Sequence, residues 1–209
     1  MGLFSAHVTG NMVILTSRIV ARQADNACLV LTVPVFVLAL VVTRLLVAGL
    51  EAREISSLRA LLLLQFVLLA GAFAFCLASD NQRDADVGSL AVAGQLCVAA
   101  MAVQNALGQL SLRGAPSTTV MTTNLAALIM VAGEALAVHY PVEAAVARHQ
   151  AKETLFVILG FVAGVGLGTA CFAVVGRSSL GVPAGLTLLA FLMSLADKPI
   201  RASDQHSNS

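Results

Sequence analysis

Two clusters of hydrogen-bonding side chains interrupt segments of the chain that are otherwise apolar. The first lies in Ala6-His7-Val8-Thr9-Gly10-Asn11, and the second lies in Thr119-Val120-Met121-Thr122-Thr123-Asn124. Polar groups in a lipid-spanning segment cost free energy, so they usually mark a site or a hydrogen bond between helices. Because both clusters end in Thr-x-Asn, the sequence predicts one polar site built by duplication.

An amide pair belongs to the same prediction. Gln104 and Asn105 lie in an apolar run, and the breakers Gly114 and Pro116 predict a tight turn after the end of that run. Counted outward from that turn, Asn105 lies level with Thr122 and Gln104 with Thr123. At 1.5 Å per residue, that level is about 12 Å into the bilayer.

The candidate site is therefore a set of hydroxyl and amide side chains around one ionisable group. His7 could accept a proton there, or it could simply sit at the membrane interface. Thr119, Thr122 and Thr123 share one helix face by their spacing. The residues predicted to bind a solute are His7, Thr9, Gly10, Asn11, Gln104, Asn105, Thr119, Thr122, Thr123 and Asn124.

A second interpretation of the same residues stays open. Thr, Asn and Gln side chains can hydrogen-bond between helices with no ligand, at roughly 0.6–2 kcal/mol each. Gly160, Gly164 and Gly168 form a repeated Gly-x-x-x-Gly pattern, which predicts close helix packing.

No catalytic or cofactor motif is evident. The sequence contains no Gly-x-Ser-x-Gly, no His-Glu-x-x-His and no phosphate-binding loop, so we expect neither an enzyme nor a bound cofactor. Cys28, Cys76, Cys97 and Cys171 form no Cys-x-x-Cys pair and lie in or beside apolar runs. They are expected to be packing residues, and no metal site is predicted.

The composition indicates an integral membrane protein. Apolar residues make up 58% of the 209 residues and charged residues 11%, against about 25% charged in a typical soluble domain. The net charge is +1 with no basic stripe, which argues against nucleic acid as a partner. The expected partners are the lipid bilayer and a small polar solute, with homo-oligomerisation left open.

Charged residues divide the chain into apolar runs. Crossing the hydrocarbon core takes about 20 residues, so the runs predict an all-α, polytopic transmembrane bundle of about seven helices. The second run contains Arg44, so it can span the membrane only if the Arg44 side chain reaches the membrane interface with its charged end. The runs cover residues 1–18, 26–50, 60–79, 87–112, 114–133, 154–176 and 178–196. Residues 140–153 are predicted to form a polar link between the fifth and sixth runs.

Apolar strings after the motifs predict an internal repeat. Val35-Phe36-Val37-Leu38 follows the first motif, and Leu155-Phe156-Val157-Ile158 follows the second. We expect parallel four-helix repeats, at 1–79 and 80–196, with the first helix of repeat one missing. Residues 197–209 are polar and predicted to be a disordered tail.

The motifs together resemble a known family. Phe4-Ser5-Ala6-His7-Val8-Thr9-Gly10-Asn11, with 101–106 and 118–124, is similar to the YoaK-type family of bacterial integral membrane proteins, a domain of unknown function. The resemblance covers nearly the whole chain and implies a multi-pass protein of the bacterial inner (plasma) membrane. Members usually begin with a further helix bearing Gly-x-x-Asp-Ala, and the family brings no established activity.

Two functions are therefore predicted. One is a small-solute transporter or permease whose polar cavity is formed by the Thr/Asn motifs. The alternative is a non-transporting membrane scaffold in which the motifs hold helices together and the glycine face docks a partner.

Overall fold

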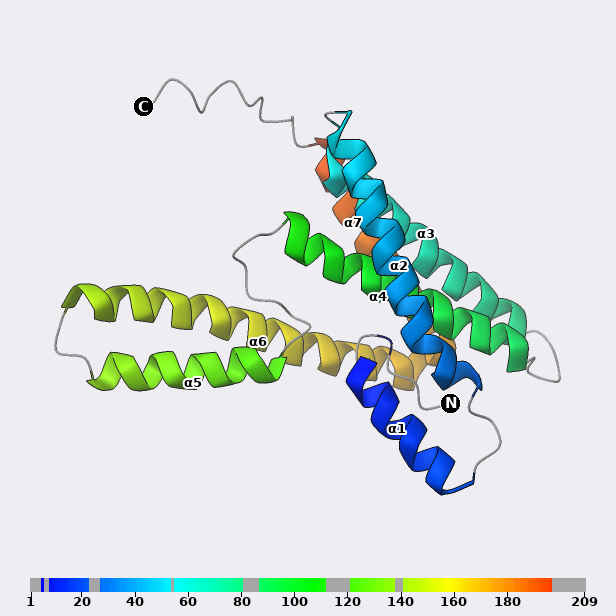
Figure 1. Cartoon of the computed structure of the whole chain (residues 1–209), viewed down its shortest axis with the longest axis horizontal. Helices are drawn as coiled ribbons and strands as arrows, with labels where there is room; N and C mark the ends of the chain where they lie inside the picture. Colours follow the sequence, from blue (N-terminus) through cyan, green and yellow to red (C-terminus); the bar gives the residue numbers. More distant parts are fainter. Residues whose placement is uncertain are drawn as a thin grey trace.

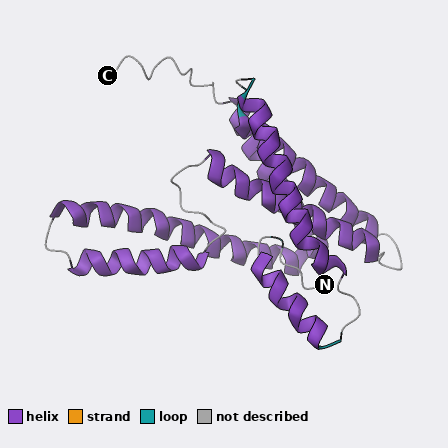
Figure 2. Ribbon diagram, viewed as in Figure 1, coloured by secondary structure: helices purple, strands orange, loops and turns teal. Residues whose placement is uncertain are grey.

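The computed structural model describes residues 5, 8–22, 27–53, 55–80, 87–111, 121–137 and 141–196, and every element in them is helical (Figure 2). The helices are α1 (Val8–Val20), α2 (Ala27–Glu51), α3 (Ser57–Asp80), α4 (Val87–Ser111), α5 (Met121–Ala137), α6 (Pro141–Val175) and α7 (Gly181–Ala196). A short 3-10 helix, η1 (Gly176–Leu180), joins α6 to α7.

Helices α2, α3, α4 and α7 form the central bundle. α3 packs against the other three, and α4 also packs along α2 (Figure 1). α1 lies against α2, whereas α5 and α6 pair with each other and extend away from the bundle (Figure 1). Helices from both predicted repeats therefore share one bundle, while the repeat itself stays a prediction.

Small apolar clusters hold the bundle together. Val47 of α2, Leu61 of α3 and Val103 of α4 form one cluster of fully buried side chains. Leu69, Ala100 and Ala184 form a second cluster, which joins α3 and α4 to α7. Alanine at two of its three positions lets the helices approach closely, as is usual between membrane helices.

Buried hydroxyl groups find partners within their own helices. Thr32 Oγ1 donates to the Leu29 carbonyl at 2.6 Å, and Thr43 Oγ1 donates to the Ala39 carbonyl at 2.6 Å. Ser79 of α3 and Thr187 of α7 make the same kind of bond. Such bonds satisfy hydroxyls that lipid could not, so these residues are compatible with apolar helices.

The junction between α6 and α7 depends on two glycines. Gly176 has a φ of +61°, a left-handed backbone conformation that a side chain would strain. Gly181 begins α7 directly against Phe73 of α3, where an added Cβ would lie 3.3 Å from the ring Cζ atom. The chain can therefore turn sharply at Gly176, and α7 can pack closely against α3.

In the described part of the chain, four helical stretches are long and apolar enough to cross a membrane, which indicates a membrane protein. They are Ala27–Glu51, Ser57–Ser79, Gly88–Leu110 and Ala151–Ala196, the last running through α6, η1 and α7. α1 has 13 residues. It spans only about 20 Å at 1.5 Å per residue, which is shorter than the hydrocarbon core. The predicted count of seven crossings therefore stays a prediction.

Two local predictions can be compared directly with the helices. α2 continues past Arg44, as predicted, and Arg44 Nη1 lies 3.6 Å from Glu51 Oε2 near the end of the helix. The polar link predicted over residues 140–153 was wrong from Pro141 onward, because α6 begins there. Pro suits a first helical position, and the Ala, Glu, Gln and Lys that follow favour a helix. The predicted turn at 113–117 and the tail at 197–209 lie outside the described residues.

Candidate functional site

The asparagine that ends each motif points inward. Asn11 in α1 is 3% exposed and Asn124 in α5 is 9% exposed. Each is the one buried residue among the described side chains of its helix, and neighbours such as Val13 and Ile129 are well exposed. Both helices therefore bury an amide and present apolar side chains outward, as lipid requires.

The remaining motif residues have more varied surroundings. His7, Thr119 and the side chain of Thr122 lie outside the described residues. Gly10 and Asn105 are half-buried, whereas Thr9, Thr123 and Gln104 are exposed. The two buried asparagines are thus the part of the predicted site with the clearest environment.

The helices that carry the motifs are not neighbours. Among the described residues, α1 packs on α2 and α5 packs on α6, with no close approach of α1 to α5. The matching of Asn105 with Thr122 and of Gln104 with Thr123 stays a prediction, because the turn between them and the side chain of Thr122 lie outside the described residues. α4 packs against α2 and α3 and does not approach α5 in the described part of the chain.

Gln104 instead has a partner in the central bundle. Gln65 Nε2 of α3 donates to Gln104 Oε1 of α4 at 3.1 Å. Gln65, the donor, is only 7% exposed. The hydrogen bond therefore joins α3 to α4 at a largely buried position. A buried amide without a partner would be costly, which explains why the two glutamines meet.

Two further polar contacts join helices that the sequence did not pair. Gln95 Nε2 of α4 donates to the Cys28 carbonyl of α2 at 2.8 Å, and Arg59 Nε of α3 donates to the Ser194 carbonyl of α7 at 3.0 Å. The Oε1 atom of Gln95 is buried and has no hydrogen-bond partner in the described structure.

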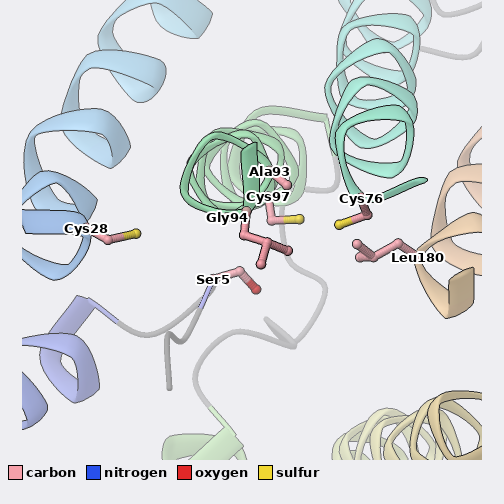
Figure 3. Close-up of a pocket in the computed structure, with 8 residues that line it drawn as sticks. Ser5, Cys28, Cys76, Ala93, Gly94, Cys97 and Leu180 are labelled. Carbon is pink, nitrogen blue, oxygen red and sulfur yellow. The ribbon is translucent and has the colours of Figure 1, made fainter. Parts of the chain in front are cut away.

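A cavity lies among α2, α3 and α4. Its volume is about 260 Å³, and Figure 3 shows three cysteine side chains directed towards it. The lining residues are Ser5, Cys28, Cys76, Leu90, Ala93, Gly94, Cys97 and Leu180. None of the described residues of the predicted binding set lines this cavity, although Ser5 belongs to the string that precedes the first motif.

The glycine pattern of α6 has no close neighbour among the residues that the structure describes. A Cβ added at Gly160, Gly164 or Gly168 would meet no described atom within 4 Å. Close packing at these glycines therefore stays a prediction, and the described helices do not supply its partner.

Gln65 and Gln95 were not singled out from the sequence, and the cavity cysteines were predicted only as packing residues. An isolated Gln inside a long apolar run was the available signal for the two glutamines, since such an amide needs a partner. Nothing in the spacing of Cys28, Cys76 and Cys97 indicates that they meet, because their convergence depends on how three helices pack.

Residues 1–193 match a family model described as "Protein of unknown function (DUF1275)". The chain belongs to this family. The match confirms the resemblance that the motifs indicated, and together with the apolar helices it indicates a membrane protein of a family whose function is unknown. No curated protein and no solved structure matches the chain.

Proposed function

We propose that this family member is a multi-pass protein of the bacterial inner membrane that carries a small polar solute. The observation that supports the proposal is the burial of Asn11 and Asn124 in helices whose other described side chains are more exposed. An amide in the same sequence position of two similar motifs, and turned inward both times, fits a duplicated binding element.

Asparagine suits recognition of an uncharged polar solute. Its side chain offers two N–H donors and a carbonyl acceptor, which can replace the water lost when a hydroxyl or amide enters the membrane. Thr9 and Thr122 stand two residues before each Asn in the predicted binding set, and Thr9 is exposed on α1 where Asn11 is buried. Such a site needs no bond to be made or broken, and accordingly we do not propose an enzyme.

The test is solute flux into proteoliposomes. Swelling would be recorded by stopped-flow light scattering with glycerol, urea or serine as the osmotic probe. Wild-type protein is expected to accelerate entry of at least one probe, and Asn11→Leu with Asn124→Leu should remove that acceleration. Val13→Leu and Ile129→Leu are matched controls, because both positions are exposed on the same helices.

Unchanged flux in well-folded Asn11→Leu and Asn124→Leu proteins would overturn the proposal, as would wild-type vesicles no faster than empty ones. The folded state of each variant would be checked by its Tm in detergent. A transporter site predicts lost flux with a nearly unchanged Tm.

The second candidate function is a non-transporting scaffold. It is favoured by the Gln65–Gln104 bond, in which a residue of the predicted site serves to join two helices. It is also favoured by the open face at Gly160, Gly164 and Gly168, which a second copy of this chain could cover. The scaffold predicts that Asn11→Leu and Asn124→Leu lower Tm, and that Gly164→Leu reduces self-association.

A further inference from the structure

Three of the four cysteines converge on the cavity between α2, α3 and α4. Cys28 comes from α2, Cys76 from α3 and Cys97 from α4 (Figure 3). Cys171 lies on α6 and does not belong to the lining. The chain thus contains a cavity with a thiol on three of its walls and a fourth cysteine that serves as an internal control.

Cys76 and Cys97 form the closer pair. Their sulfur atoms point toward one another across the α3–α4 contact (Figure 3). Cys28 faces the cavity from the opposite side (Figure 3), where its Sγ atom accepts a hydrogen bond from Gln95 Nε2 at 3.4 Å. None of the three is in a disulfide.

The rest of the lining offers little to a hard cation. Apart from the thiols, the described lining residues contribute the Ser5 hydroxyl and apolar groups. No three His, Cys, Asp or Glu side chains in the described ranges are placed to hold a metal ion, so a tetrahedral zinc site is not formed there. Sulfur is a soft ligand that selects soft ions, and two facing sulfurs suit an ion that binds two ligands in line.

We infer that Cys76 and Cys97 bind one soft, thiophilic cation between α3 and α4. In the binding step the cation forms a bond to each sulfur, and thiol protons leave to water. A charge buried among apolar helices is costly, so the number of protons released equals the charge of the cation. A monovalent ion is then held by one thiolate and one thiol, and a divalent ion by two thiolates.

The experiment uses the purified full chain in detergent with Hg(II) as the probe. Unbound ion is removed by washing with a monothiol competitor, which strips an ion held by a single cysteine, and the retained mercury is counted per chain. Wild type, Cys28→Ser and Cys171→Ser are expected to retain a single ion, while Cys76→Ser and Cys97→Ser lose it. Retention of mercury by Cys76→Ser and Cys97→Ser would overturn the assignment. Loss of mercury from Cys171→Ser would overturn it as well.

Two measurements on wild-type protein do not depend on how the variants fold. X-ray absorption at the mercury edge should show two sulfur neighbours, and a shell with nitrogen, oxygen or a third sulfur would contradict the paired site. Titration in weak buffer should release two protons for each Hg(II) and one for each Ag(I). Equal release for both ions would contradict the neutral site.

Discussion

Gln65 donates a hydrogen bond from Nε2 to Oε1 of Gln104 at 3.1 Å, and this bond joins α3 to α4 inside the apolar bundle. The donor is almost fully buried. The pair gives Gln104 a structural role before any solute is considered. It also provides a polar contact whose strength can be measured apart from the packing around it.

The first prediction is that the two glutamines are energetically coupled. Gln65→Leu or Gln104→Leu removes one partner and leaves the other amide short of a bond, at a cost of about 1–2 kcal/mol in the free energy of unfolding. The double variant should lose less than the sum of the single losses. A double-mutant cycle from unfolding curves in detergent measures this coupling, and strictly additive losses would show that the bond contributes nothing.

The second prediction concerns the turn between α6 and α7. Gly176→Ala puts a side chain on a backbone with φ of +61°, which should cost about 1 kcal/mol of stability. Gly166→Ala in α6 is the matched control, because its added Cβ meets open space. It should be neutral or slightly stabilising, and equal losses for both variants would argue against strain at the turn.

The third prediction tests the packing of α7 against α3. Gly181→Leu pushes a side chain into the Phe73 ring, which already lies 3.3 Å from the site of a Cβ, and overpacking of this kind costs about 1–3 kcal/mol. Adding Phe73→Ala should recover part of that stability, whereas Gly185→Leu alone should be tolerated. Unfolding in detergent would measure all three, and no recovery from Phe73→Ala would contradict the contact.

The fourth prediction compares two leucines of α3. Leu61 is fully buried between α2 and α4, and Leu63 is 44% exposed. Leu61→Ala leaves a cavity whose lining loses its packing contacts, so a loss of about 2 kcal/mol or more is expected. Leu63→Ala should cost distinctly less, and the reverse order would place the bundle core elsewhere.

Much of the helical structure could be predicted from where the charges fall. Residues 60–79 and 87–112 match α3 and α4 closely, because an apolar run of this length can satisfy its backbone only as a helix. The charged and polar residues in 141–153 predict a link between helices, so the start of α6 at Pro141 was not predicted. Polar residues with high helix propensity continue a helix beyond the apolar run.

The partners of each helix could not be predicted in the same way. Apolar helices such as α4 and α5 gain little from one neighbour over another when lipid is equally apolar. The choice depends on a few side chains, such as Gln65 with Gln104, and on small residues such as Gly181. The burial of Asn11 and Asn124 followed from their polarity, while the meeting of Cys76 and Cys97 required the packed bundle.

The central claim is that Asn11 and Asn124 face a polar route through an apolar protein. The most direct measurement replaces each with cysteine, in a protein whose native cysteines are serine, and follows its reaction with a small water-soluble methanethiosulfonate in vesicles. Asn11→Cys and Asn124→Cys should react. Val13→Cys and Ile129→Cys should not, because these exposed positions would face lipid under the proposal. If positions 11 and 124 are as inert as 13 and 129, the two amides only hold helices together and the transport proposal fails.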